Sequence, residues 1–113
     1  MSGDDAGTIY VKIVVKNGDG NTRENASNAV YALFPAARLN GIRRKNDDTA
    51  FNYRVDTTSL NQNGGEALVP RDEVCAGLLC KLVEALRPAM TVVSCRMLYI
   101  TAEGIRVKIV VTP

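Results

Sequence analysis

Few residues of this 113-residue chain have the types and spacing that covalent or metal chemistry requires. The chain has no histidine, so it lacks the commonest general base and cannot form a Ser-His or Cys-His pair. Its three cysteines, Cys75, Cys80 and Cys95, include no CxxC pair, and no histidine is present to complete a zinc site. We therefore expect the three cysteines to act as small apolar core residues, with a redox role as the alternative. We expect no metal and no cofactor.

The acidic and glycine-rich segments do not form the pattern of an active site either. Asp47-Asp48 and Asp72-Glu73 are adjacent pairs, which solvation of a loop and a favourable interaction with a helix dipole explain. Gly18-Asp-Gly20 and Gly64-Gly65 lack the spacing and the lysine of a phosphate-binding loop. The sequence therefore predicts no catalytic residues and a protein that is not an enzyme.

Basic residues and tyrosines form the one pattern that indicates a binding function. Cations neutralise phosphate groups, and tyrosine rings stack on bases. The candidate nucleic-acid-binding residues are Tyr10, Lys12, Lys16, Arg43, Arg44, Lys45, Tyr99, Arg106 and Lys108. These residues can form one binding site only if the strands and loops that carry them place them on the same surface.

The hydrophobic pattern predicts an α+β fold. The segments with a strand pattern are 8–16, 50–60, 66–69, 91–101 and 105–112. One helix is expected from a cap at Asn21 or Thr22 to Pro35, and a second over residues 71–87. This order predicts two helices on one face of a mainly antiparallel sheet, in a ferredoxin-like βαββαβ order with an extra C-terminal strand.

Two connections decide how the strands pair. Residues 61–65 are a strong turn signal, so 50–60 and 66–69 are expected to form a hairpin. Residues 43–48 are expected to be a polar connection, from which Arg43, Arg44 and Lys45 extend the basic surface. Glu103-Gly104 is expected to form a two-residue turn between the last two strands.

The two end strands are near copies of each other. Residues 9–16 and 105–112 are identical at six of eight positions, which convergence on strand-forming residues and a duplication both explain. The expected core residues of these strands are Ile9, Val11, Ile13, Val15, Val107, Ile109 and Val111. With the two-residue turn, Tyr99 lies opposite Lys108 and Thr101 opposite Arg106, on the helix-free face.

The order of elements is also that of the RNA-recognition-motif family. In that family an aromatic-rich strand contacts RNA, and it would lie near residues 50–60 here. Phe51-Asn-Tyr-Arg-Val55 lacks the glycine-flanked pattern with aromatic residues on the exposed face. Membership of the family is therefore not inferred.

Composition sets the remaining limits. The length predicts a single domain over residues 1–113, with a flexible N-terminus over 1–7, and 46% hydrophobic residues are enough for a core. A net charge of +2 excludes a strongly basic protein but permits a local basic patch. The acidic start and the absence of a long apolar run predict a cytoplasmic protein that does not bind membranes.

These observations favour a small non-enzymatic binding protein that forms a dimer or larger homo-oligomer. Its expected ligand is RNA or single-stranded nucleic acid, bound on the basic sheet face. The alternative is a structural or interaction protein, either a self-assembling, coat-like viral or phage component or a small inhibitor of a host complex. A solvated face without a ligand and a protein interface would use the same residues.

Overall fold

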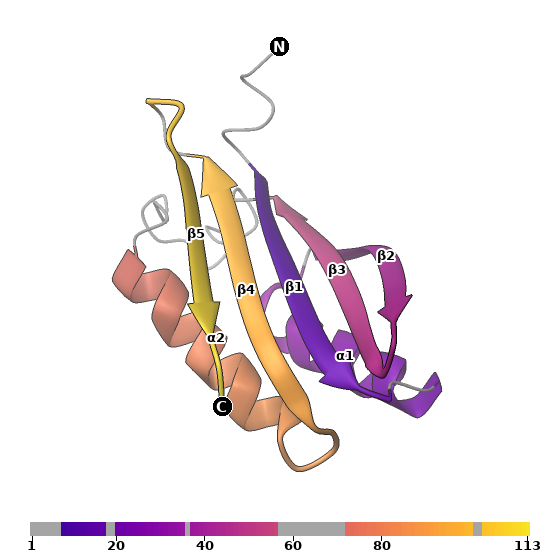
Figure 1. Ribbon diagram of the computed structural model, residues 1–113. Coiled ribbons are helices and arrows are strands. Elements are labelled where there is room, and N and C mark those ends of the chain that lie inside the picture. The colour runs from indigo at the N-terminus through magenta and orange to yellow at the C-terminus, as the bar shows by residue number, and fades with distance from the viewer. Residues whose placement is uncertain (1–7, 18–19, 36, 57–71, 101–102) are drawn as a thin grey trace.

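A computed structural model describes residues 8–17, 20–35, 37–56, 72–100 and 103–113. The elements in chain order are β1 (Thr8–Lys16), α1 (Gly20–Leu33), β2 (Arg38–Lys45), β3 (Asp48–Asp56), α2 (Asp72–Leu86), β4 (Val92–Ile100) and β5 (Arg106–Val111). The strands form one antiparallel sheet in the order β2-β3-β1-β4-β5. Both helices lie behind the sheet in Figure 1 and cover one of its faces. The predicted α+β class, with two helices and an antiparallel sheet, is confirmed.

Strand β1 lies at the centre of the sheet and supplies the middle of the core. Its side chains alternate between the two faces of the pleat, so every second residue points under the helices. Ile9, Val11, Ile13 and Val15 are all buried on that face, while Val107 and Ile109 of β5 are half-buried against the same core. The predicted core positions are confirmed for β1, whereas Val107, Ile109 and Val111 of β5 pack against the core without being fully buried.

Helix α1 packs on the sheet through buried apolar residues and through contacts with Tyr53. Ala26 and Val30 are buried at helical spacing. The Ser27 hydroxyl lies 2.9 Å from the Tyr53 hydroxyl, and the Tyr31 ring meets the Tyr53 ring edge-on at 6.3 Å. Burial raises the pKa of Tyr53, and the hydrogen bond to Ser27 lowers it by a smaller amount. Tyr53 is therefore a core residue that joins α1 to the sheet.

The middle of the chain contains a hairpin between β2 and β3 that the sequence does not predict. Residues 43–48 are a tight hairpin rather than a polar connection, because Lys45 pairs with Asp48 across the turn at Asn46-Asp47. Asn46 has a φ of 55°, a left-handed conformation that asparagine tolerates. The sequence does not predict strand β2, because an edge strand rich in exposed charges lacks the alternation of hydrophobic and polar residues. The expected turn at 61–65 and strand at 66–69 lie outside the described residues.

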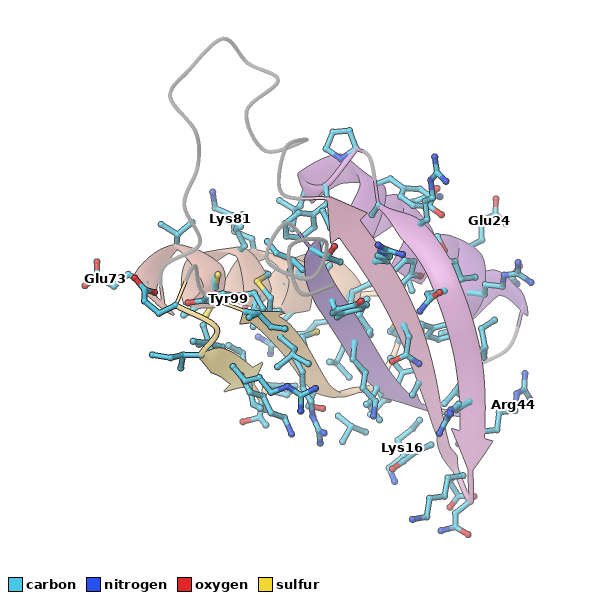
Figure 2. All side chains as sticks on the ribbon, turned by 90° about the horizontal axis from the view of Figure 1, so that it is seen from above. Lys16, Glu24, Arg44, Glu73, Lys81 and Tyr99 are labelled. Atoms are coloured by element: carbon cyan, nitrogen blue, oxygen red, sulfur yellow. The ribbon has the colours of Figure 1, made fainter. Side chains whose placement is uncertain are left out.

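The predicted pairing of the last two strands is wrong by one residue. Tyr99 lies opposite Val107, and Leu98 lies opposite Lys108. The last pair that the structure describes in this direction is Ile100 with Arg106, and this register does not fit the assumed two-residue turn at Glu103-Gly104. A shift of one residue moves a side chain to the other face. Tyr99 is accordingly 4% exposed on the helix side of the sheet (Figure 2).

This pairing makes a prediction about two neighbouring residues of β4. Met97→Ala should lower the free energy of unfolding by about 2–5 kcal/mol, because Met97 is fully buried under the helices. Leu98→Ala should cost clearly less, because Leu98 is half-buried on the opposite face. Urea denaturation of both variants measures the difference, and a larger loss at Leu98 would contradict the pairing.

Candidate nucleic-acid interface

The sheet face without helices, called the open face here, collects most of the chain's basic residues. Nine of the 14 lysines and arginines belong to it by their strand register: Lys12, Lys16, Arg38, Arg43, Lys45, Arg54, Arg96, Arg106 and Lys108. The same register gives this face two acidic positions, Asp48 and Asp56, which pair with Lys16 and Thr8 of β1. The near-neutral chain therefore has a strongly cationic surface on one side.

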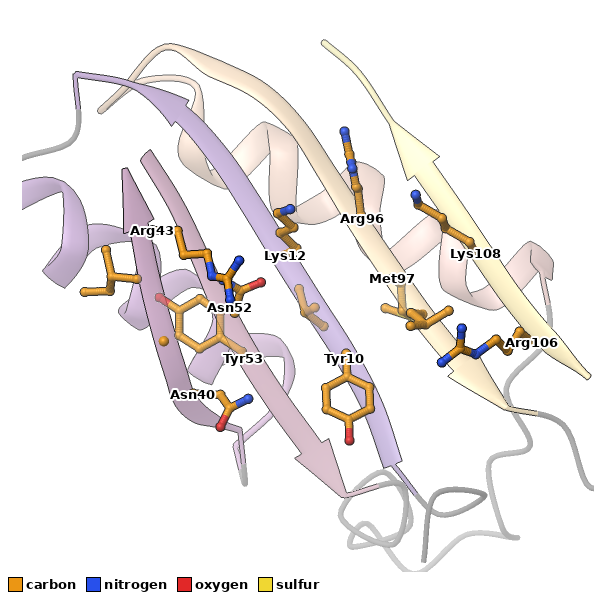
Figure 3. Close-up of a pocket in the computed structure, with 14 residues that line it drawn as sticks. Tyr10, Lys12, Asn40, Arg43, Asn52, Tyr53, Arg96, Met97, Arg106 and Lys108 are labelled. Atoms are coloured by element: carbon orange, nitrogen blue, oxygen red, sulfur yellow. The ribbon is translucent and has the colours of Figure 1, made fainter. Parts of the chain in front are cut away.

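A shallow groove of about 850 Å³ crosses the open face and touches all five strands (Figure 3). Its cationic lining residues are Lys12, Arg43, Arg96, Arg106 and Lys108. The lining also includes Tyr10 and the amides of Asn40 and Asn52, and none of the described lining residues is acidic. Asn40 lies where a register shift between Leu39 and Gly41 interrupts the pairing of β2 with β3. The groove therefore offers positive charge together with neutral hydrogen-bonding groups.

Two like charges face each other directly in the centre of the groove. Lys12 of β1 pairs with Arg96 of β4, and Lys108 lies on the other side of β4, opposite Leu98. None of these three cations forms an ion pair within the described residues. The Arg96 Nε is buried without a hydrogen-bond partner there. Opposed like charges are unfavourable in a sheet, so an anion placed between them would be stabilising.

Lys16 differs from the groove cations because its charge is already compensated. Its Nζ lies 2.7 Å from Asp48 Oδ1, and both side chains are exposed. The hydrogen bond and the negative charge of Asp48 raise the pKa of Lys16. The Lys16 ammonium group is therefore less available to an added anion than that of Lys12, a difference that the sequence does not reveal.

The structure brings together some of the predicted site residues and separates others. Tyr10, Lys12, Arg43, Arg106 and Lys108 line the groove. The remaining predicted residues lie elsewhere: Lys16 in its ion pair, Lys45 on the open face at the β2–β3 turn, Arg44 on the helix side of β2 and Tyr99 in the core. Arg43, Arg44 and Lys45 belong to an edge strand and not to a loop. Alternation along that strand places Arg44 opposite buried Thr49, away from the groove.

Sequence reasoning missed several residues of the open face. Arg96, Leu98 and Ile100 occupy the place expected for Tyr99. The signal was present, because the charged Arg96 should face solvent, and Tyr99 is three residues away and so on the opposite face. Arg54 and Asn52 were predictable in the same way, as the alternates of buried Phe51 and Tyr53.

The described residues contain little that suggests another kind of site. No group of three or more cysteine, aspartate or glutamate residues lies close enough there to hold a metal ion. None of the helices in this part of the chain is long and apolar enough to cross a bilayer. A comparison with models of known protein families finds no match, and neither does a comparison with curated protein sequences.

The cysteines yield a prediction about thiol reactivity. Burial raises the pKa of Cys95 to about 12, and Cys75 is buried too, whereas Cys80 is exposed on α2. Because the thiolate is the reactive form, Cys95 should resist a disulfide reagent at pH 8 while Cys80 reacts. Titration with Ellman's reagent should detect one fast thiol in the native protein and all three in urea. Fast native reaction of the Cys80→Ser variant would contradict this assignment.

Proposed function

We propose that this protein is a small non-enzymatic binding protein whose open face holds RNA or single-stranded nucleic acid. The observation that carries the proposal is the Lys12–Arg96 pair, which has no ion-pair partner and no acidic groove residue beside it in the described part of the chain. A polyanion supplies the missing negative charge at regular intervals, which single carboxylates of a folded partner do not. Binding releases counterions from the nucleic acid and should therefore depend strongly on salt.

The distribution of charge also explains why the groove, and not another surface, is proposed. The exposed helix positions that the structure describes carry opposite charges in balance: Glu24, Glu73 and Glu84 against Arg23, Lys81 and the adjacent Arg87. A nucleic acid is therefore attracted more strongly to the open face than to the helix side. The molecule is therefore electrostatically polarised, which orients a polyanion before contact.

Charge reversal in the groove tests the proposal. The double variant Lys12→Glu/Lys108→Glu should weaken binding to a labelled single-stranded RNA by about tenfold or more. The matched control is Arg23→Glu/Lys81→Glu, which changes the net charge equally on exposed helix positions; Figure 2 places Lys81 on the side of α2 away from the sheet. Fluorescence anisotropy measures both affinities, and equal losses in the two double variants would contradict the groove as the site.

The salt dependence gives a second readout of the same residues. The neutral variant Lys12→Gln/Lys108→Gln should reduce the slope of log K against log salt by roughly 1.4, since each single-strand phosphate contact contributes about 0.7. An unchanged slope would mean that these lysines do not neutralise phosphates, even if the affinity falls for another reason.

The proposal includes self-association, supported by the contrast between the two edges of the sheet. The β2 edge is protected by basic side chains and a register shift, both of which discourage pairing with another strand. Strand β5 pairs with β4 in a regular register. Its Val110 side chain is 47% exposed, and Ile105, the residue before the strand, is 60% exposed. A second copy is the expected occupant of that edge.

The proposal also includes the type of fold. The order of the elements and the pairing of β5 with β4 support a ferredoxin-like unit with one added strand.

Light scattering coupled to size exclusion tests self-association. We expect a dimer that Val110→Lys converts to monomer, because an edge lysine opposes strand addition. Ile42→Lys, at a similarly exposed position on the β2 edge, is the matched control and should leave the dimer intact. A wild-type monomer would contradict the proposal, and a discrete large assembly would favour the coat-like structural role instead.

A further inference from the structure

The groove on the open face has two chemically different parts. Its centre is cationic, with Lys12, Arg96 and Lys108 on three neighbouring strands. At the end of β1 nearer its N-terminus, a second hollow of about 300 Å³ is lined by Tyr10, Leu98, Tyr99, Ile100 and Arg106. Leu98 and Ile100 are half-buried apolar side chains on the open face, and Tyr99 belongs to the core side by its register. The two parts therefore suit different portions of one ligand.

Tyr10 is the one aromatic residue of the chain on the open face. Of the other tyrosines, Tyr31 lies on α1, and Tyr53 and Tyr99 are buried on the helix side. Both phenylalanines, Phe34 and Phe51, are buried as well. An aromatic ring on a phosphate-binding face can stack on a base, and one ring offers a platform for about one base.

Arg106 completes the small hollow beside Tyr10. Figure 3 shows its guanidinium pointing from β5 toward β4, on the side of the groove where Tyr10 lies. A guanidinium plane stacks on a base and also binds phosphate, so it can cover a ring held against Tyr10. Leu98 and Ile100 pair with Lys108 and Arg106, which places apolar and cationic side chains next to each other.

We infer that this hollow is a subsite for one unpaired nucleobase, with the phosphates of the same strand bound at Lys12, Arg96 and Lys108. The inference rests on the proposed function and deepens it by naming the class of ligand, a single-stranded or looped-out nucleotide. Tyr10 and Lys12 lie two residues apart on β1, which is roughly 7 Å, a spacing that one nucleotide spans between its base and a phosphate. The bases of a regular duplex are stacked inside the helix and do not reach the hollow.

The test compares four probes of known chemistry. They are a single-stranded RNA, the single-stranded DNA of the same sequence, the RNA duplex and inorganic polyphosphate, which carries phosphates without bases. Wild-type protein should bind the single strands more tightly than the duplex or polyphosphate at equal salt. The two single-strand arms show whether the sugar matters.

Three substitutions at Tyr10 separate stacking from packing. Tyr10→Leu keeps an apolar side chain but removes the ring, and should weaken single-strand binding by roughly 5- to 140-fold. Its polyphosphate affinity and salt slope should equal those of wild type. Tyr10→Phe keeps the ring and should restore single-strand binding, while Tyr10→Ala should resemble Tyr10→Leu. Circular dichroism confirms that the variants remain folded.

The outcomes separate this inference from the proposed function. If Tyr10→Leu binds single strands as wild type does, or if the duplex binds as tightly as the single strand, the base subsite is overturned. In either case the Lys12→Glu/Lys108→Glu variant still reports on the phosphate site. If wild type binds none of the four probes, both the subsite and the proposed function are overturned.

Discussion

The alternation of β1 between a buried and an open face is the constraint on which the rest of the structure depends. Ile9, Val11 and Ile13 are removed from water by the helices, so register with β3 and β4 is set by hydrophobic burial. The same pleat forces Tyr10 and Lys12 onto the opposite face. The core and the candidate site thus both depend on the pleat of β1. A change in its register would move the buried residues and the open-face residues together.

Burial also decides which polar groups remain available for binding. Tyr53 and Tyr99 contribute their rings to the core, and the Tyr53 hydroxyl is held by Ser27. On the open face, Asp48 compensates Lys16 at one end, while Lys12 and Arg96 face each other with no ion-pair partner among the described residues. Repulsion between neighbouring cations reduces the stability of the free protein, and the polyanion that we propose as ligand would relieve it. The repulsion between the groove cations is therefore consistent with the proposed anionic ligand.

Much of this arrangement was predictable from local pattern, and the failures have physical causes. Strand β1 and helix α2 were predictable because each has a strong hydrophobic period. Strand β2 was not, because its exposed arginines at a sheet edge have no apolar face. The assignment of Tyr99 to the open face relied on a turn assumed to contain two residues. The observed pairing instead buries Met97 and Tyr99 under the helices.

The sequence by itself determined the α+β class, the buried faces of the end strands and the scarcity of chemically reactive residues, because these follow from residue type and periodicity. The tertiary structure decided which charges lie together. A chain with a net charge of +2 places nine cations on one sheet face only because strands distant in sequence become neighbours in the order β2-β3-β1-β4-β5. The juxtaposition of Lys12, Arg96 and Lys108 depends on register, and register is set by long-range packing of the core.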